Sequence, residues 1–158
     1  MSSNFRLKII FINFFIYIEV ELISIIMMSN LKFIDLFAGC GGLSLGLEQA
    51  GFHPVYVNEL NTDALNTYLI NRTDYKYLGL KEFHSKNIKE LTNSKKKLDL
   101  LSKNLKKKFN INKGDLSLIV GGPPCQGYSG IGHRRSYKVD KEKIPSNYLY
   151  KEMYKVIE

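Results

Sequence analysis

Two parts of this sequence carry residue types that could do chemistry together. Cys125 stands in the segment GGPPCQGYSG, directly after two prolines, and a thiolate is both a soft nucleophile and a good leaving group. A glycine-rich segment, Gly39 to Gly42, follows one apolar run, and Glu59 follows another. Such residues are typical of a nucleotide-like cofactor held on a glycine turn. A free cysteine can also be a small buried apolar residue, so composition alone leaves Cys125 open.

Hydrophobic periodicity predicts the elements that must position these residues. Short apolar runs predict strands, and apolar positions at helical spacing predict helices between them. The predicted strands are 31–37, 54–58, 83–88 and 116–120, and the predicted helices are 43–50, 63–71, 95–109 and 147–158. Strands that alternate with helices indicate βαβ units and a parallel sheet, so we predict the α/β class. In such folds Cys125 would lie at the carboxyl edge of the sheet, where ligands bind.

The glycine segment and Glu59 together favour a cofactor that contains ribose. Glycines allow close approach of the backbone to a ligand, and the helix that follows presents free N–H groups. The segment lacks the glycine spacing of dinucleotide-binding proteins. Glu59 follows Gly42 by 17 residues, near the roughly 20 expected for a carboxylate that binds ribose hydroxyls. A glycine turn by itself would be weak evidence, because any tight turn after a strand can use one.

The composition predicts one globular domain with a basic surface. The 158 residues are 44% hydrophobic, and 23 Lys and Arg against 15 Asp and Glu give a net charge of +8. This balance suits a polyanion such as nucleic acid, although many soluble proteins are mildly basic. Cys40 and Cys125 lie too far apart in sequence for a disulfide framework or metal-ligand spacing. We therefore expect no metal site and a reduced, cytoplasmic setting.

The first part of the chain, 1–28, differs from the rest. Its apolar run is interrupted by Glu19 and Glu21 and is shorter than the roughly 20 residues that a spanning helix needs. We therefore expect no membrane association, and we interpret residues 1–26 as sequence upstream of the true start. The alternative is a genuine hydrophobic extension. A single domain is assigned to 29–158.

Four segments resemble signatures of DNA cytosine-5 methyltransferases, in the order found in that family. DLFAGCGGLSLGLEQAGF resembles the first signature, NELNTDALNTY the second, and GGPPCQGYSGIGHRR the fourth, which contains the catalytic cysteine. Asn147-Tyr148-Leu149 resembles the beginning of the next signature. The resemblance covers 31–158. It implies the N-terminal part of a catalytic domain with a Rossmann-like sheet that depends on S-adenosylmethionine and is incomplete at its C-terminus.

The resemblance also implies which residues bind the cofactor. Glu59 would meet the ribose, and Leu60 would lie beside the adenine. One position departs from the family, because Asn87 replaces the usual aspartate that accepts a hydrogen bond from the adenine amino group. An amide oxygen can still accept that bond, so we expect weakened binding rather than a lost site. The full implied set is Phe37, Ala38, Gly39, Cys40, Gly41, Gly42, Glu59, Leu60, Asn87, Ile88, Pro123 and Leu149.

In the chemistry that the resemblance implies, the Cys125 thiolate adds to C6 of a cytosine flipped out of double-stranded DNA. This addition makes C5 nucleophilic enough to take the methyl group, and loss of the C5 proton then expels the thiolate. The loop around the cysteine would contact DNA through Gln126, Ser129, Arg134 and Arg135. For the two arginines, ordinary exposed basic residues are an equally good interpretation.

Several later signatures of the family do not occur in the sequence, among them a Glu-Asn-Val segment and the target recognition domain. We therefore expect no methyl transfer by this chain alone, and we expect a bacterial restriction-modification origin. One alternative is a non-catalytic subunit, or one that assembles with a separately encoded C-terminal half. Another is an RNA cytosine-5 methyltransferase, because the same loop chemistry serves RNA.

Overall fold

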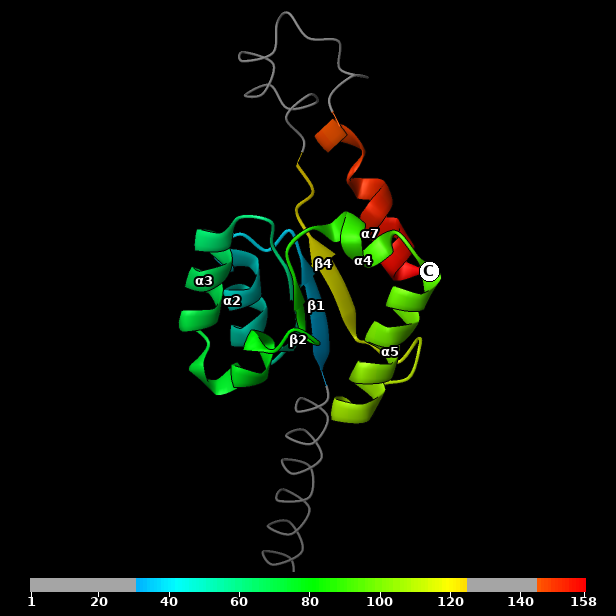
Figure 1. Cartoon of the computed structure of the whole chain (residues 1–158). Helices are drawn as coiled ribbons and strands as arrows, with labels where there is room; N and C mark the ends of the chain where they lie inside the picture. The colour runs from blue at the N-terminus through cyan, green and yellow to red at the C-terminus, as the bar shows by residue number, and fades with distance from the viewer. Residues whose placement is uncertain (1–30, 125–144) are drawn as a thin grey trace, which may run out of the picture.

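A parallel four-stranded sheet forms the middle layer of the protein, and helices cover both of its faces (Figure 1). The computed structural model describes residues 31–124 and 145–158, and the structural statements below concern this part of the chain. The strand order is β3-β2-β1-β4, and every neighbouring pair is parallel. This architecture confirms the predicted α/β class and is consistent with a Rossmann-like methyltransferase sheet.

The central strands are β1 (Lys32–Leu36) and β2 (His53–Asn58), which agree with the predicted strands to within a residue at each end. Their apolar residues are almost completely buried, as expected for a parallel sheet covered on both faces. The register between them shifts between Phe33 and Ile34, opposite Pro54. Proline has no N–H to donate to the ladder, which accounts for an irregularity at this point.

The two edge strands are shorter than predicted or displaced. Strand β4 is Leu118–Gly121 rather than 116–120. Strand β3 is only His84–Ser85, because the chain turns into the short helix α4 (Ile88–Thr92) where we expected a strand up to residue 88. Asn87 starts that helix: its side-chain oxygen accepts a hydrogen bond from the N–H of Lys89 at 3.1 Å. The prediction was wrong here because an N-cap asparagine was not recognised.

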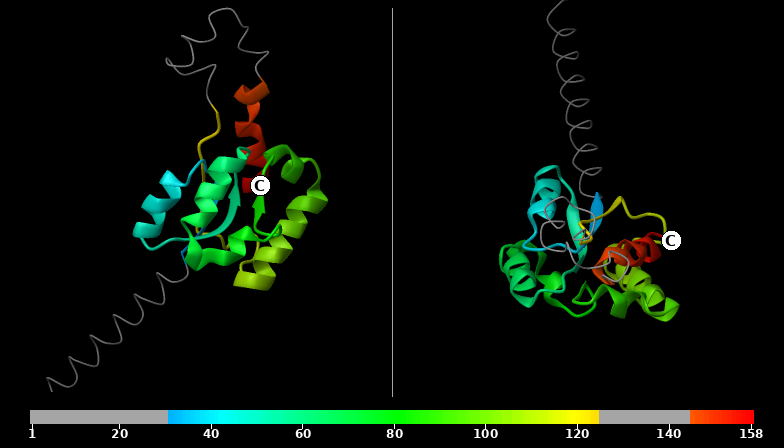
Figure 2. Two further views of the ribbon diagram at one scale, coloured as in Figure 1. Left: turned by 60° about the vertical axis from the view of Figure 1, so that its left-hand side comes forward. Right: turned by 90° about the horizontal axis from the view of Figure 1, so that it is seen from above.

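Helices α2 (Gly42–Gln49) and α3 (Thr62–Ile70) cover one face of the sheet, together with the 3₁₀ segment η1 (Thr73–Gly79) (Figure 2). Gly51 follows α2 with φ +86°, a left-handed conformation that glycine adopts readily at the end of a helix. Asn61 caps α3, since its side-chain oxygen accepts from the N–H groups of Asp63 and Ala64. The η1 segment was not predicted.

Helices α4, α5 (Lys95–Phe109) and α7 (Tyr150–Ile157) cover the other face. The helix predicted at 95–109 is confirmed, and it is amphipathic, because Leu101 and Leu105 are buried and its lysines are exposed. Before α7 the chain forms the 3₁₀ segment η3 (Pro145–Tyr148), so the α-helix predicted from residue 147 begins three residues later. Helix α7 packs on α4, and its Glu152 accepts a hydrogen bond from the Thr92 hydroxyl.

The order of the strands determines where a ligand can bind. The chain passes from β1 to β2 to β3 with α2 and α3 on one face, then returns through α5 on the opposite face to place β4 beside β1. The strand order therefore reverses between β1 and β4. In open α/β sheets this reversal leaves a crevice at the carboxyl ends of the strands.

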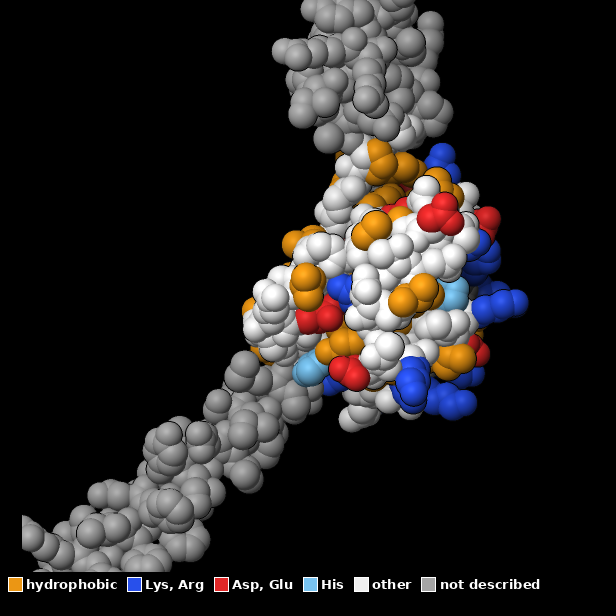
Figure 3. Space-filling view, turned by 90° about the vertical axis from the view of Figure 1, so that its left-hand side faces the viewer, with side chains coloured by type: hydrophobic (Ala, Val, Ile, Leu, Met, Phe, Trp, Pro, Cys, Tyr) orange, Lys and Arg blue, Asp and Glu red, His pale blue; other side chains and the backbone are white. Residues whose placement is uncertain are grey.

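The surface over α2 and α3 carries apolar side chains that are scattered among polar and charged ones (Figure 3). Leu43, Leu45 and Ile70 are more than half exposed on these two helices. Isolated exposed apolar residues are normal on a globular protein, so they do not by themselves mark an interface. No helix in the described part of the chain is long and apolar enough to cross a membrane.

Candidate functional site

A cavity of about 620 Å³ lies at the carboxyl ends of the strands, beside the reversal of the strand order. Segments that follow each of the four strands contribute to its walls, and η3 and the residue after it close one side. The lining residues are Phe37, Asn58, Glu59, Leu60, Asn61, Lys86, Asn87, Ile88, Lys89, Gly122, Pro124, Ser146 and Leu149. The volume is that of a typical small-molecule site.

Glu59, directly after β2, is the only carboxylate that lines the cavity among the described residues, and two backbone N–H groups fix its position. One carboxylate oxygen accepts from the N–H of Gly39 at 2.8 Å, and the other accepts from the N–H of Asn61 at 2.7 Å. A carboxylate oxygen can accept more than one hydrogen bond, so each retains capacity for a ligand hydroxyl. Glu59 therefore joins the glycine turn after β1 to the start of α3 and presents an acceptor to the cavity.

The turn after β1 has an unusual backbone. Phe37, Gly39 and Gly41 have φ angles of +59°, +56° and +90°. A positive φ is uncommon for a bulky residue such as phenylalanine, and strain of this kind concentrates at functional sites. Hydrogen bonds from the N–H of Ala38 to the Asn58 carbonyl and from the N–H of Gly41 to the Ala38 carbonyl, both 3.0 Å, hold the turn.

Asn58 is a wall residue that the sequence did not point to. It is buried at the end of β2, and its side-chain amide donates to the Ser85 carbonyl, the Ser85 hydroxyl and the Lys86 carbonyl at 3.2, 2.9 and 2.9 Å. These bonds attach the end of β2 to the short strand β3. They position the segment that contains Asn87 relative to Glu59. Its position as a polar residue at the end of a strand could have marked it as a site residue, but the sequence analysis singled out only its neighbour Glu59.

Asn87 has a second task besides lining the cavity. Its side-chain oxygen already accepts from the N–H of Lys89, where it caps α4, and it retains capacity for one more bond. Ile88 beside it is 3% exposed, whereas Leu60, which also lines the cavity, is 67% exposed. A large exposed apolar side chain on a cavity wall can be covered by a flat apolar ligand.

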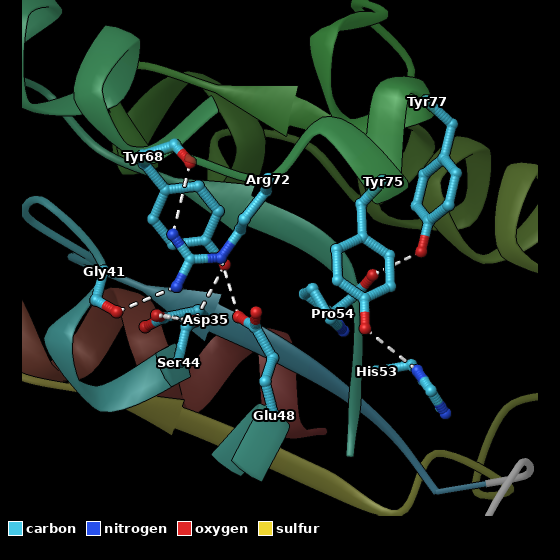
Figure 4. Close-up of polar contacts among 10 residues, drawn as sticks. All are labelled: Asp35, Gly41, Ser44, Glu48, His53, Pro54, Tyr68, Arg72, Tyr75 and Tyr77. Carbon is cyan, nitrogen blue, oxygen red and sulfur yellow. Dashed lines mark hydrogen bonds and ion pairs between the residues drawn. The ribbon is translucent and has the colours of Figure 1, made fainter. Parts of the chain in front are cut away.

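A network of polar side chains lies behind the glycine turn (Figure 4). Asp35 of β1 accepts from the Ser44 hydroxyl at 2.5 Å, and Ser44 also bonds to the Tyr68 hydroxyl at 2.7 Å. Arg72 lies over the Tyr68 ring at 3.8 Å and pairs with Glu48 at 2.6 Å. Burial raises the pKa of Asp35 from 3.8 to about 6, although the Ser44 hydrogen bond opposes that change. Sequence patterns did not single out this network, because its members come from β1, α2, α3 and the segment after α3.

The predicted cofactor residues fall into two groups. Phe37, Glu59, Leu60, Asn87, Ile88 and Leu149 line the cavity. Residues 38 to 42 form the turn that Glu59 holds, and within it Cys40 is exposed. Pro123 is half-buried, whereas its neighbours Gly122 and Pro124 reach the cavity wall. The predicted nucleophile and the predicted DNA contacts, Cys125, Gln126, Ser129, Arg134 and Arg135, lie outside the described residues, as do residues 1–30.

The donor and acceptor set of the cavity fits an adenosine-like group. A fixed carboxylate suits ribose hydroxyls, an amide oxygen suits an exocyclic amino group, and apolar side chains suit the faces of a flat base. Glu59, Asn87 and the apolar residues Phe37, Leu60 and Ile88 supply these. Within the described ranges, no cluster of His, Cys, Asp or Glu side chains could hold a metal ion.

Comparison with known proteins places this geometry in context. Residues 31–158 match the family model described as C-5 cytosine-specific DNA methylase. The chain is 34% identical to M.MjaORF1200P of Methanocaldococcus jannaschii over 80% of this chain and 42% of that protein. It is 36% identical to the type II methyltransferase M1.HphI of Haemophilus parahaemolyticus, over 81% of this chain and 29% of the relative. It is also 36% identical to the DNA (cytosine-5)-methyltransferase PliMCI of Paracentrotus lividus, over 77% of this chain and 7% of that protein. The chain thus spans less than half the length of these relatives.

Proposed function

Because this chain belongs to the C-5 cytosine-specific DNA methylase family, we propose that it binds S-adenosylmethionine in the cavity at the carboxyl ends of the strands. Acting with the remaining part of a methyltransferase, it would transfer the methyl group to C5 of cytosine in double-stranded DNA. The observation that supports the cofactor site most directly is the Glu59 carboxylate, which two backbone N–H groups hold at the cavity wall.

The residues of the cavity would divide the binding of S-adenosylmethionine among them. Glu59 would accept hydrogen bonds from the ribose hydroxyls, and Asn87 would accept one from the adenine amino group. Leu60 and Ile88 would cover the faces of the adenine, and the turn that begins at Phe37 would meet the amino-acid end. When bound, S-adenosylmethionine supplies a methyl group on a positively charged sulfur.

Cys125 would supply the nucleophile, because it follows the described segment Gly121–Pro124 in the motif PPCQG. Its thiolate would form a bond to C6 of the cytosine while N3 takes up a proton. C5 would then form a bond to the methyl group as the methyl–sulfur bond breaks, with S-adenosylhomocysteine as the leaving group. Loss of the C5 proton and of the N3 proton would restore the aromatic ring and expel the thiolate unchanged. A thiolate suits both steps, since it is nucleophilic and leaves readily.

Calorimetric titration of the full chain with S-adenosylhomocysteine tests the cofactor site. Glu59→Ala should weaken binding by about 10–100-fold, because hydrogen bonds to a charged acceptor contribute roughly 1.5–3 kcal/mol. The control is Glu82→Ala, which removes an exposed carboxylate that does not line the cavity. If the wild type binds and Glu59→Ala binds equally well, the ribose contact belongs to another residue. If the wild type does not bind, the proposed site is overturned.

The nucleophile is tested with the complementing C-terminal polypeptide of a relative supplied in trans. Cys125→Ser should abolish methyl transfer, because a serine hydroxyl is far less ionised than a thiol and is a poorer leaving group. Cys40→Ser should retain activity, since Cys40 is exposed in the glycine turn. DNA that carries 5-fluorocytosine should trap the complemented enzyme, because fluorine at C5 blocks the last step. An adduct mapped to Cys40, or full activity of Cys125→Ser, would refute the assignment.

The setting of a bacterial restriction-modification system, and hence the cytoplasm, is part of the same proposal. It is supported by the name of M1.HphI, a type II methyltransferase that matches 81% of this chain. Cells that express the complemented enzyme should contain DNA resistant to one restriction endonuclease. DNA that remains sensitive to all endonucleases, despite an active enzyme in vitro, would argue against this setting.

A further inference from the structure

We propose that the ion pair between Arg72 and Glu48 positions the glycine turn for S-adenosylmethionine, with Arg72 acting through the carbonyl of Gly41. This inference rests on the proposed cofactor site and adds to it a residue outside the cavity. Arg72 is a positioning residue here, because it does not line the cavity.

Arg72 makes three polar contacts from one guanidinium group (Figure 4). Its Nε donates to a Glu48 carboxylate oxygen at 2.6 Å, Nη2 donates to the Gly41 carbonyl at 2.8 Å, and Nη1 donates to the Tyr68 carbonyl at 3.2 Å. The guanidinium also stacks on the Tyr68 ring, with 3.8 Å from its central carbon to the ring centroid. One rigid group therefore links α2, α3 and the turn.

The contacts are largely shielded from solvent. The side chains of Arg72 and Glu48 are 5% and 17% exposed, so solvent screens the pair only weakly. Arginine can satisfy three acceptors at fixed angles because its guanidinium is planar, whereas a lysine ammonium is a compact point charge. Only an arginine can therefore serve Glu48 and both carbonyls in this geometry.

The hold on Gly41 is transmitted to the cavity through the backbone of the turn. The Gly41 carbonyl accepts from the N–H of Leu45 as well as from Arg72, so both of its lone pairs are used. The N–H of Gly41 donates to the carbonyl of Ala38. The N–H of Gly39, the residue after Ala38, donates to the carboxylate of Glu59. The turn is thus held by Glu59, which lines the cavity, and by Arg72, which does not.

Space around Gly41 is limited by the same side chains. A Cβ added at this position would lie 2.5 Å from Nη1 of Arg72 and 2.7 Å from a ring carbon of Tyr68. Tyr68 is in turn fixed through Ser44 to Asp35 on β1. The guanidinium, the ring and the turn therefore form one packed unit, and a change in Arg72 should alter the turn before it alters the rest of the sheet.

The test compares Arg72→Lys with Leu105→Ala in the full chain. Arg72→Lys keeps the positive charge beside Glu48 but cannot make all three hydrogen bonds of the planar guanidinium. Leu105→Ala lowers stability from the opposite face of the sheet, where α5 lies, without touching the turn. Amide hydrogen exchange followed by NMR reports on the turn without any ligand, and calorimetry with S-adenosylhomocysteine reports on binding.

Exchange at Gly41 and Leu45 should accelerate about 10-fold in Arg72→Lys relative to amides of β2, and S-adenosylhomocysteine should bind about 10-fold more weakly. Leu105→Ala should change neither the exchange rate at Gly41 and Leu45 relative to β2 nor the affinity for S-adenosylhomocysteine, although its melting temperature falls. Glu48→Gln keeps both carbonyl contacts of Arg72 and should show a smaller effect of the same kind; it decides the question if Arg72→Lys does not fold.

Two results would overturn the inference. One is unchanged exchange at Gly41 and Leu45 in the folded variant, and the other is an equal loss of affinity in Leu105→Ala. A wild type that does not bind S-adenosylhomocysteine would instead overturn the proposed cofactor site. In that case the exchange measurement still decides whether Arg72 fixes the turn, so the two failures can be told apart.

Discussion

Replacing Asp35 with asparagine should change the way in which stability depends on pH. Asp35 is 1% exposed on β1, and burial raises the pKa of its carboxyl from 3.8 to about 6. Between these two values the folded state keeps a proton that the unfolded state has lost. Folding is therefore favoured by lowering the pH through this window, and the full cost of the buried charge is present above about pH 6.

The size of the effect follows from the two pKa values. At about 1.4 kcal/mol per pH unit, the interval between 3.8 and about 6 corresponds to roughly 3 kcal/mol. This is a large part of the 5–15 kcal/mol that typically stabilises a domain. The amide in Asp35→Asn can still accept from Ser44 but does not titrate, so the variant should lack this component.

Urea denaturation followed by circular dichroism, at intervals from pH 4 to pH 7, measures the effect. The free energy of unfolding of Asp35→Asn minus that of the wild type should rise by about 2 kcal/mol across this range, because the rest of the effect lies below pH 4. Other titrating groups contribute equally to both proteins and cancel in the difference. A difference that stays constant from pH 4 to pH 7 would refute the reasoning, because it would mean that Asp35 titrates at its ordinary pKa in the folded protein.

Two further predictions concern the turn and the cavity. Gly41→Ala should destabilise the protein by about 1–3 kcal/mol or more, because φ is +90° and the new Cβ would contact Arg72 and Tyr68. Gly46→Ala in α2, where nothing lies within 4 Å, should instead be neutral or stabilise by up to about 1 kcal/mol; equal urea midpoints for the two would contradict this account. Asn87→Asp should strengthen S-adenosylhomocysteine binding about 5-fold in calorimetry, because a charged acceptor forms a stronger bond and still caps α4; weaker binding would argue against the contact with adenine.

The sequence determined the parts of the protein that depend on short segments. Apolar runs of β-branched and aromatic residues gave β1 and β2 to within a residue at each end. The spacing of leucines gave α5, because an amphipathic helix needs only a periodic pattern. Family signatures then pointed to Glu59, which the structure places on the cavity wall. Each of these features is encoded within about 15 consecutive residues.

The prediction from hydrophobic pattern was wrong where a single polar side chain favours a different backbone conformation. The apolar residues around Phe83 and Ile88 suggested one strand, but the Asn87 side chain bonds to the N–H of Lys89 and starts a helix instead. One such bond is enough to redirect a short segment, because a strand of two residues contributes little pairing energy of its own.

Only the tertiary structure decided how separate segments act together. Glu48 and Arg72 are 24 residues apart, and nothing in their own segments indicates that they meet behind Gly41. The cavity likewise depends on the strand order, which brings Gly121 at the end of β4 beside Leu36 at the end of β1, although they are 85 positions apart in the sequence. Contacts of this kind are selected by the packing of whole elements against the sheet. A sequence read in short windows supplies the side chains, whereas the fold determines which of them become neighbours.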